Sequence, residues 1–365
     1  MKKFNEIFID KTKYGEKIQT SEYEKQGKHI IVDQGQAEIA GYTNREEGLF
    51  NEVPVIIFGD HTRLIKYIDE PFFLGADGVK VLRSKEKNAN YKYLYYALKS
   101  AKIPNTGYNR HFKWLKDVEI NYPDSVKQEK IVDILDRVSD VIEKRKAELS
   151  YLDTLIKARF VEMFGDIATG NYKYDTRKLG DVANVGSSHR VFTTEFVKKG
   201  IPFYRGTEIG ELANGNKPAE PFYISEEHYN RLVYNDTKPQ VGDLLLPSIC
   251  NKGQVWMVDT DEPFYYKDGR VLCISPDREI FDTKYLEYFM RAKTLVEYPK
   301  LGSGSTFAEF KIFILKNIDV LIPPRELQEQ FSMFVHQVDK SKVAVQKALE
   351  ESQLLFDSLM QEYFG

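Results

Sequence analysis

The sequence predicts an α+β protein in which two globules of mixed α/β structure are joined by two long helices that form an antiparallel coiled coil with internal pseudo-two-fold symmetry. Two observations predict this architecture. A segment of about 40 residues recurs at an offset of 200 residues, and both copies carry apolar residues at spacings of three and four. Short apolar runs separated by glycine and proline turns fill the rest of the chain, as expected for strands and short helices.

The repeat is the strongest organising feature of the sequence. Pro123 begins a segment that ends at Gly165, and Pro323 begins one that ends at Gly365. Identical pairs within it include Gln128 and Gln328, Leu149 and Leu349, Leu155 and Leu355, and Glu162 and Glu362. Upstream, DEPFF at residues 69–73 recurs as DEPFY at 261–265. The second copy carries about 19 extra residues, roughly within Gly210 to Gly242, where Gly, Asn and Pro predict a long loop.

The recurring segments are predicted to be helices with narrow apolar stripes. Such stripes favour a helix partner and a coiled-coil seam, although each helix could instead pack only on its own globule. About 38 residues make a rod of roughly 57 Å, which suits a spacer. Antiparallel pairing of repeated helices would bring the two chain termini close together. The predicted seam residues are Ile131, Leu135, Val138, Ile142, Leu149, Leu152, Ile156, Phe160 and Met163 in the first helix and Phe331, Val335, Val338, Val345, Leu349, Phe356, Met360 and Tyr363 in the second.

The bulk properties agree with a multidomain protein but do not by themselves indicate a nucleic-acid binder. A length of 365 residues exceeds the usual size of one core. The expected division is two globules at 1–123 and 166–323 and two helices at 124–165 and 324–365. The formal net charge of −3, from 52 basic and 55 acidic side chains, would require DNA binding to rest on a local basic face.

The sequence argues against a metal site and against a membrane or secreted protein. Cys250 and Cys273 lie outside any two-cysteine metal-ligand spacing, so we expect no structural zinc and no other metal site. No apolar run of about 18 residues and no basic-then-apolar leader is present, so a cytoplasmic protein without a membrane span is expected.

Asp60 and His61 are the best candidates for acid–base chemistry. They follow the apolar run from Val53 to Ile57, but neighbours on a strand point to opposite faces. The corresponding region of the second copy reads SICNK at 248–252, so the pair is not repeated. A duplicated hydrolase using Asp60 and His61 is therefore a minor alternative, beside a helical scaffold that binds only protein.

A basic segment from Lys99 to Lys116 is the best candidate for binding. It contains five lysine or arginine residues and no acidic residue, with Tyr108, Phe112 and Trp114 interleaved. Such a run can hold phosphates and present donors to base edges. It could equally be a solvated loop leading to a strand whose Phe112, Trp114 and Val118 face the core.

Further polar residues near the predicted turns extend the candidate DNA-binding set, because Gln, Asn and Arg can contact bases in two-pronged fashion. Ser187 to Thr207 are expected to fill places in the second globule similar to those of Gln34 to Arg45 in the first. The first-globule candidates are Gln34, Gln36, Tyr42, Asn44, Arg45, His61, Thr62, Arg63, Lys66, Tyr108, Asn109, Arg110, His111 and Lys113. The second-globule candidates are Ser187, Ser188, His189, Arg190, Arg205, Thr207, Asn251, Lys252, Ser303, Ser305, Thr306 and Lys311.

Over essentially its whole length, the chain resembles the specificity subunits of Type I restriction-modification systems. The resemblance is carried in the first half by IVDQGQ at 31–36, IAGYT at 39–43, IFGDHTR at 57–63, GADGVKVL at 75–82 and TGYNRHFKWL at 106–115. QEKI at 128–131, RFVEMFG at 159–165 and PPRELQEQ at 323–330 resemble the conserved helices of that family. LGDV at 179–182 and GIP at 200–202 resemble the opening of its target-recognition domains.

The resemblance implies two target-recognition domains that read the two halves of a split double-stranded DNA target around an unread spacer. It also implies two modification subunits, which methylate adenine, and two restriction subunits, which are motor nucleases. S-adenosylmethionine, Mg²⁺ and ATP would then lie only on those partners, and this chain would hold no cofactor and no catalytic residue. Neither an Asn-Pro-Pro-aromatic methyltransferase motif nor a Gly-Lys-Ser/Thr phosphate loop occurs in the sequence.

Overall fold

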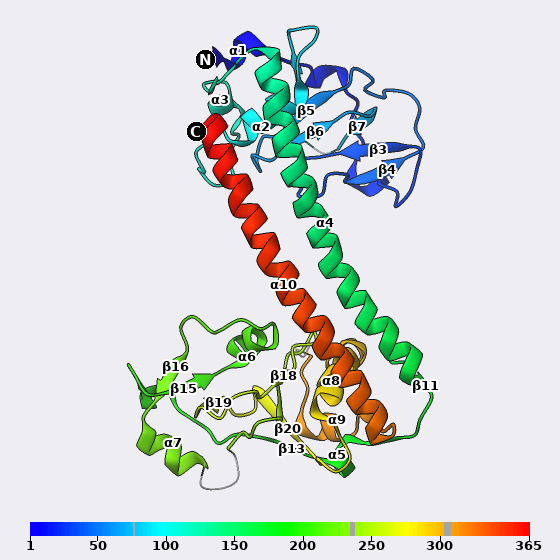
Figure 1. Cartoon of the computed structure of the whole chain (residues 1–365), viewed down its shortest axis with the longest axis vertical. Coiled ribbons are helices and arrows are strands. Elements are labelled where there is room, and N and C mark those ends of the chain that lie inside the picture. The colour runs from blue at the N-terminus through cyan, green and yellow to red at the C-terminus, as the bar shows by residue number, and fades with distance from the viewer. Residues whose placement is uncertain (76, 234–237, 303–307) are drawn as a thin grey trace. The chain divides into compact units, whose positions relative to one another are not determined.

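The computed structural model describes residues 1–75, 77–233, 238–302 and 308–365. The chain forms two compact units (Figure 1). Unit 1 comprises Met1–Glu148 together with Val345–Gly365, and unit 2 comprises Leu149–Ala344. Each long helix therefore contributes to both units.

Two small sheets and three short helices build the globular part of unit 1. A four-stranded sheet has the order β2-β8-β5-β6, and a three-stranded sheet has the order β4-β3-β7, with β3 and β7 parallel. A third pair, β1-β9, joins the first residues to the segment that precedes the long helix. The strands are β1 (Lys2–Lys3), β2 (Phe8–Asp10), β3 (His29–Val32), β4 (Gly41–Thr43), β5 (Val55–Gly59), β6 (Ile65–Ile68), β7 (Phe72–Leu74), β8 (Val79–Ser84) and β9 (Glu119–Ile120), and the helices are α1 (Phe4–Ile7), α2 (Tyr91–Lys99) and α3 (Phe112–Leu115).

Unit 2 repeats this framework with additions. Its sheets have the orders β13-β20-β17-β18 and β14-β16-β15-β19, and β15 and β19 are again parallel. β12 and β21 take the place of β1 and β9, and β10-β11 is an extra hairpin. The strands are β10 (Gly165–Asp166), β11 (Asn171–Tyr172), β12 (Thr176–Lys178), β13 (Ala183–Ser187), β14 (Phe196–Val197), β15 (Ile201–Tyr204), β16 (Phe222–Ile224), β17 (Leu244–Pro247), β18 (Trp256–Met257), β19 (Tyr265–Tyr266), β20 (Val271–Pro276) and β21 (Asp319–Leu321), and the helices are α5 (Leu179–Val182), α6 (Gly206–Ala213), α7 (Glu226–Leu232), α8 (Thr283–Glu297) and α9 (Ile312–Lys316).

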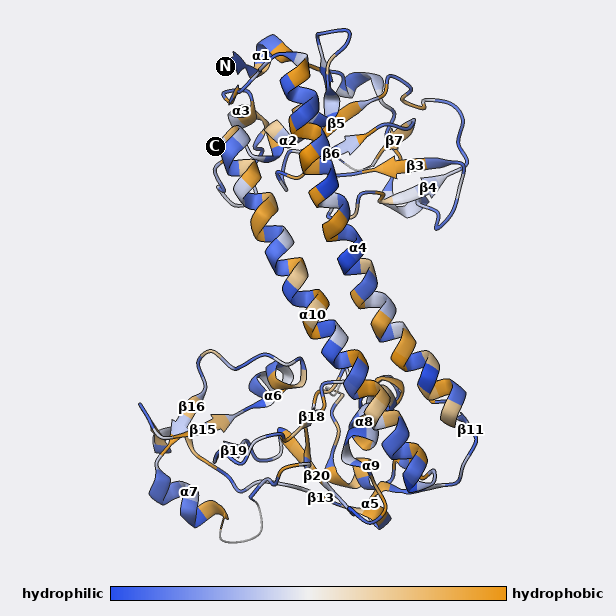
Figure 2. Ribbon diagram, viewed as in Figure 1, coloured by the Kyte–Doolittle hydropathy of each residue, from blue (hydrophilic) through white to orange (hydrophobic). Residues whose placement is uncertain are grey.

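The two long helices confirm the predicted repeat. α4 (Ser125–Phe164) and α10 (Arg325–Phe364) each contain 40 residues and begin and end at positions 200 residues apart. Apolar residues recur along both helices among polar ones, as Figure 2 shows. This is the pattern that a helix acquires when one face packs and the other contacts water.

Within each unit the two helices run antiparallel and also pack on the globule. In unit 1, Ile131, Leu135 and Ile142 of α4 share a core with Phe356 of α10 and with α2. In unit 2, the ring of Phe331 lies 5.4 Å from that of Phe160, while Lys342 pairs with Asp153. The prediction of helix pairing is therefore confirmed. The alternative, in which the helices pack on the globules, is also correct, because the same helix residues contact both the other helix and the globule.

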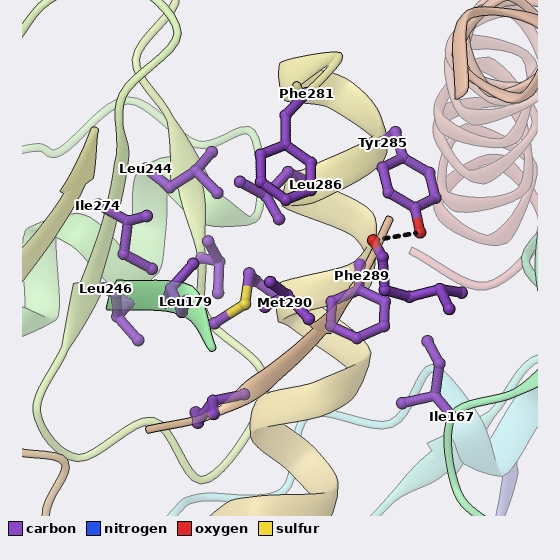
Figure 3. Packing of buried hydrophobic residues seen from close by; sticks show 14 of the residues in the cluster. Ile167, Leu179, Leu244, Leu246, Ile274, Phe281, Tyr285, Leu286, Phe289 and Met290 are labelled. Carbon is purple, nitrogen blue, oxygen red and sulfur yellow. Dashed lines mark hydrogen bonds between the residues drawn. The ribbon is translucent and has the colours of Figure 1, made fainter. Parts of the chain in front are cut away.

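The core of unit 2 is built mainly around α8 (Figure 3). Tyr285, Phe289 and Met290 on this helix belong to the same buried cluster as Leu244, Leu246 and Ile274 on the four-stranded sheet. The hydroxyl group of Tyr285 donates a hydrogen bond to the carbonyl oxygen of Leu321 at 3.2 Å. Tyr93 does the same in unit 1, where its hydroxyl group donates to the carbonyl oxygen of Asn121 at 2.7 Å. The repeat thus extends to individual buried hydrogen bonds.

Two sequence predictions about local structure are wrong. The stretch Gly210–Gly242, expected to be a long loop, contains the second half of α6, the strand β16 and the helix α7. The strand that was one of the two alternatives for Phe112 to Val118 is also wrong: the segment begins with the short helix α3, in which Phe112 and Leu115 are buried while Trp114 is only half-buried. Phe112 and Leu115 are three residues apart, so a single helical turn places both side chains on one face, toward the core.

The predicted closeness of the termini is confirmed within unit 1. Met1 and Gly365 line the same cavity of about 550 Å³, beside α2 and Ile120. The side-chain amide of Asn121 also donates to the carbonyl oxygen of Tyr363 at 3.2 Å.

Candidate nucleic-acid interface

Four loops of unit 1 meet at one edge of its sheets, and Gln34 joins three of them. Its Nε2 donates to the carbonyl oxygen of Asp77 at 2.9 Å, and its Oε1 accepts from the backbone N–H of His61 at 3.1 Å. Gly78 has a φ of 93°, and a Cβ there would lie 2.7 Å from Nε2 of Gln34. Glycine is required at this position both by the backbone conformation and by the close approach. Gln34 is therefore held between loops and only partly exposed.

Asp60 fastens the fourth loop, residues 103–110, to the β5–β6 hairpin. Its buried carboxylate accepts the backbone N–H of Phe112 at 2.7 Å, and its carbonyl oxygen accepts both the backbone N–H and the Nδ1 of His111, at 2.8 and 3.0 Å. His111 is fully buried. The carboxylate is thus bound to a main-chain amide rather than to His61, so the hydrolase alternative has no support.

The hairpin also supports the middle of this loop. The ring of His61 stacks on that of Tyr108, with centroids 4.6 Å apart and planes 9° from parallel. Arg63 has a φ of 63°, and its guanidinium donates to the carbonyl oxygen of Ile103 at 3.3 Å. The loop therefore presents a fixed set of exposed side chains: Asn105, Tyr108, Asn109 and Arg110.

Lys66 and His111 are buried, which corrects their prediction as DNA contacts. The ammonium group of Lys66 donates to the carbonyl oxygen of Ala37 at 2.5 Å and lies 3.8 Å from the carboxylate of Asp33. Burial lowers the pKa of Lys66, although Asp33 and Glu38 oppose this effect. Both side chains are engaged inside the unit, so neither can contact a surface ligand.

The remaining unit 1 candidates separate into two groups. Gln36, Thr62, Asn109, Arg110 and Lys113 are exposed on or beside the four loops. Tyr42, Asn44 and Arg45 lie on or just beyond β4, in which Thr43 pairs with His29 at the start of β3 rather than with its end.

Asn44 and Arg45 are occupied by other contacts, away from Gln34. Asn44 donates to Glu24, and Arg45 forms an ion pair with Glu16. The structure does not bring them to the four loops.

A carboxylate lies at the border of the loops. Asp77 is exposed and pairs with Lys17, whose hydrogen bond and charge hold the pKa of the Asp77 carboxyl below its usual value, with a further contribution from Arg110. This pairing reduces the negative potential that a duplex would meet beside Arg110.

In unit 2 the counterpart of the β5–β6 hairpin is the segment after β17. The backbone N–H of Phe310 donates to the carbonyl oxygen of Ser248 at 2.7 Å, as that of His111 does to Asp60. This equivalence confirms the predicted correspondence of residues 248–252 and places Ile249 where unit 1 has His61. Asn251, Lys252 and Lys311 are exposed in this region.

The other unit 2 candidates occupy two different places. Arg205 and Thr207 follow β15, the counterpart of β3, as predicted. Ser187 to Arg190 instead follow β13, the counterpart of β2, so their predicted equivalence to Gln34–Arg45 is wrong.

Ser187 and Ser188 take part in internal hydrogen bonds to the carbonyl oxygens of Val271 and Tyr266. Arg205 is paired with Glu208, which raises its pKa, while His189 and Arg190 are exposed. Ser303, Ser305 and Thr306 lie outside the described residues.

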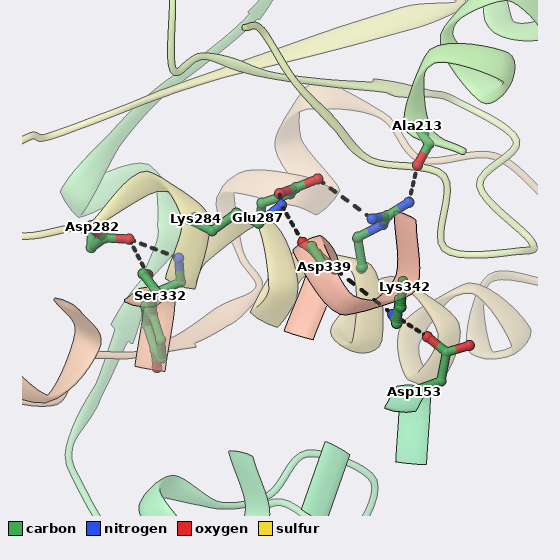
Figure 4. A network of polar contacts seen from close by, with 10 residues as sticks. Asp153, Ala213, Asp282, Lys284, Glu287, Ser332, Asp339 and Lys342 are labelled. Atoms are coloured by element: carbon green, nitrogen blue, oxygen red, sulfur yellow. Dashed lines mark hydrogen bonds and ion pairs between the residues drawn. The ribbon is translucent and has the colours of Figure 1, made fainter. Parts of the chain in front are cut away.

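A polar network in unit 2, which sequence reasoning missed, joins α8 to both long helices (Figure 4). Glu287 is nearly buried between Lys284 and Arg291, and Lys342 lies between Asp153 and Asp339. These residues line a cavity of about 480 Å³. Charges at spacings of three and four on α8 were a possible signal, but only the fold brings α4 and α10 beside them.

Neither a reactive cysteine nor a group of metal-ligating side chains is found in the part of the chain that the structure describes. Burial raises the pKa of the Cys250 thiol to about 11 and that of Cys273 to about 12, which leaves both unreactive near neutral pH. Across the described ranges, His, Cys, Asp and Glu form no group of three or more that could hold a metal ion. Among the same residues, none of the helices combines the length and apolar character needed to span a bilayer.

The comparisons with known proteins agree with this fold. The family described as Type I restriction modification DNA specificity domain matches residues 1–151 and 171–352. The chain is 23% identical over 269 residues to the Type I restriction enzyme MjaIX specificity subunit of Methanocaldococcus jannaschii, a match that covers 67% of this chain and 60% of that protein. It is 29% identical over 133 residues to the EcoR124I/EcoR124II specificity subunit of Escherichia coli, covering 33% of each. The matches thus span less than two thirds of either relative.

Two solved structures share the fold. The S subunit of a Type-I restriction-modification system from M. genitalium superposes with a TM-score of 0.59 at 16% identity, over 100% of this chain and 95% of that one. A chain from a study of complex assembly and conformational transition of the type I R-M system gives a TM-score of 0.54 at 16% identity, over 99% and 95%. These matches confirm the α+β architecture. Since the family match covers most of both units, the chain belongs to the Type I restriction modification DNA specificity family.

Proposed function

We propose that this chain is the sequence-reading subunit of a Type I restriction-modification system, and that each unit reads one half of a bipartite DNA target. The observation that carries the proposal is the repetition of one framework with different surface residues. At equivalent positions, unit 1 has His61, Thr62 and Arg63, whereas unit 2 has the exposed residues Ile249 and Asn251 on either side of the buried Cys250. Two similar scaffolds with different side chains are suited to two different base sequences.

Charge supports DNA as the ligand despite the negative net charge. The exposed loop of unit 1 lies within a segment, Lys99 to Lys116, that carries no acidic residue. Arg110 and Lys113 are exposed there, while Asp77 beside them is paired with Lys17. Phosphate contacts from such cations would hold the unit on the duplex, and neighbouring side chains would read base edges.

The catalytic chemistry is assigned to partner subunits. In this proposal two modification subunits hold S-adenosylmethionine and methylate adenine, two restriction subunits use ATP and Mg²⁺, and this chain holds no cofactor. Such a complex acts on cellular DNA in the cytoplasm.

The long helices offer a surface for these partners. Several apolar side chains on the helices point away from both cores, among them Tyr151, Val343 and Leu354, which are each exposed by about two thirds or more. Exposed apolar residues on a helix are available for contact with a partner protein.

Methylation assays test the proposed division of labour. The pure chain, incubated with S-adenosylmethionine and DNA, should methylate nothing, whereas addition of the modification subunits should give adenine methylation at a split sequence. Methylation by the chain alone would contradict the proposal.

A pair of variants tests whether each unit reads its own half-site. Arg110→Ala should weaken selection of bases in one half of the target and Lys311→Ala in the other. The target preferences of both variants would be read from the methylomes of cells that carry the complete system. Identical effects of the two variants on both halves would overturn the assignment of one half to each unit.

A further inference from the structure

The most exposed aromatic side chain near the four loops of unit 1 is Tyr108. The residue is 88% exposed, and one face of its ring lies against His61 in a nearly parallel stack. The other face has no aromatic contact in the part of the chain that the structure describes. A flat apolar face held open to solvent is unusual for a tyrosine that serves only stability.

The loop that carries Tyr108 is ordered by its own hydrogen bonds. The side chain of Asn105 accepts the backbone N–H of Gly107 at 3.2 Å, and the side-chain amide of Asn109 donates to the carbonyl oxygen of Thr106 at 2.5 Å. Gly107 has a φ of 78°, a conformation that favours glycine. The ring of Tyr108 is thus presented by a built turn rather than by a free tail.

The β5–β6 hairpin fixes this turn at three points. Asp60 binds the residues that follow it, Arg63 binds Ile103 before it, and His61 supports its tip. Arg63 adopts a left-handed backbone conformation that glycine or asparagine would adopt more readily. The Nδ1 atom of His61 is buried without a hydrogen-bond partner among the described residues. The strained backbone of Arg63 and the unpaired Nδ1 of His61 thus both occur where the hairpin meets the loop.

The surroundings of the open face favour a polyanion. Asn109 and Arg110, which follow Tyr108 directly, are exposed, as is Lys113, and Tyr108 lies within the segment from Lys99 to Lys116 that contains no acidic residue. An isolated ring within a basic surface can contact a groove while the cations contact phosphates.

We propose that Tyr108 is a specificity-determining residue whose open face packs against the C5-methyl group of a thymine in the half-site read by unit 1. His61 is the positioning residue that holds the ring. The inference rests on the proposed function and refines it by naming the base feature that is read. Because Ile249 replaces His61 in unit 2, this aromatic pair belongs to unit 1 alone.

Replacement of thymine by uracil tests the contact directly, because it removes only the methyl group. The complex of the full chain with its modification subunits would first be used to select duplexes from a random library, and each thymine of the selected half-site would then be changed to uracil. For the unaltered chain, one position should lose about fourfold in affinity, the value expected for one buried methyl group. With Tyr108→Ala, the same exchange should have no effect.

The positioning role of His61 is tested by a pair of variants whose different results could not arise from loss of folding. His61→Ala should abolish the thymine preference at that position, and His61→Phe should restore it because a phenyl ring can support the same stack. Ile249→Ala is the matched control in unit 2 and should leave this position unchanged.

The outcomes separate the inference from the proposed function. If the Tyr108→Ala complex still selected both half-sites but lost as much affinity on uracil exchange as the unaltered complex, the inference would be overturned and the proposed function would stand. A Tyr108→Ala variant that assembled poorly but kept its full base preference would identify Tyr108 as a protein contact and would also overturn it. Failure of the unaltered complex to select any split sequence would overturn the proposed function, and the inference with it.

Discussion

Gln128 and Gln328 occupy equivalent buried positions near the starts of the long helices, but their hydrogen bonding differs. The Nε2 of each donates to the carbonyl oxygen of the proline five residues earlier, at 2.9 Å in both units. Gln328 additionally donates to the carbonyl oxygen of Ile280 at 3.0 Å and accepts the backbone N–H of Asp282 at 2.9 Å. It thereby connects α10 to the turn before α8 in unit 2.

This difference predicts unequal stability losses for one pair of matched substitutions. Gln328→Met should lower the free energy of unfolding of unit 2 by about 2–3 kcal/mol, and Gln128→Met should lower that of unit 1 by about 1 kcal/mol, because methionine keeps the volume but leaves buried backbone groups unpaired. Each unit holds one of the two tryptophans, Trp114 and Trp256. Fluorescence during guanidinium unfolding, with the other tryptophan replaced by phenylalanine, reports each unit separately. Equal losses would contradict the role given to Gln328.

For individual residues, the sequence located the region of the candidate interface correctly but was less successful in predicting which of its side chains are exposed. The segments around Asp60 and Tyr108 were found because acid-free basic runs and strand ends are local patterns. The burial of Lys66 and His111 was missed because their partners, Ala37 and Asp60, are distant in sequence. Whether a polar side chain faces water or a buried carbonyl group depends on these tertiary contacts.

The long helices were the most predictable elements. Their limits follow from proline at the start and from apolar residues at spacings of three and four over the whole length. The region between Gly210 and Gly242 was mispredicted because α6 and α7 are short and are stabilised mainly by packing. Ile209 and Ala213 contact the sheet beside Trp256, and Tyr229 contacts Tyr265. Helices of seven or eight residues have too few turns to give a clear periodic signal.

The exposed face of the helices should be needed for assembly rather than for folding. Leu354→Glu should weaken binding of the modification subunits at least tenfold with little loss of stability, because Leu354 is 69% exposed and burying an unpaired charge in an interface is costly. Reversal of charge at Lys144 and Lys146 together should act in the same direction. Co-purification and calorimetric titration would measure the effect, with Val197→Glu on β14 as the control. Unchanged assembly of the Leu354 variant would place the partners elsewhere.

At the scale of the whole molecule, we expect the helices to set the spacing between the two half-sites. Insertion of four residues after Leu149 and four after Leu349 lengthens each helix by about 6 Å. Since one base pair spans about 3.4 Å, the unread spacer should lengthen by roughly 1–2 base pairs while both half-sites stay the same. Methylome sequencing of the double insertion reads the spacer directly. A changed half-site with an unchanged spacer would show that the helices are not the ruler.

The chain segments that make up the two units determine the order in which the units can be completed during synthesis. Unit 2 is one continuous stretch, Leu149–Ala344, whereas unit 1 needs Val345–Gly365 in addition to the first 148 residues. Phe356, Met360 and Phe364 complete the core around α2 only when these residues have left the ribosome. The part of the chain that is made first is therefore completed last, and until then the apolar side of α2 and the first half of α4 must remain protected from aggregation.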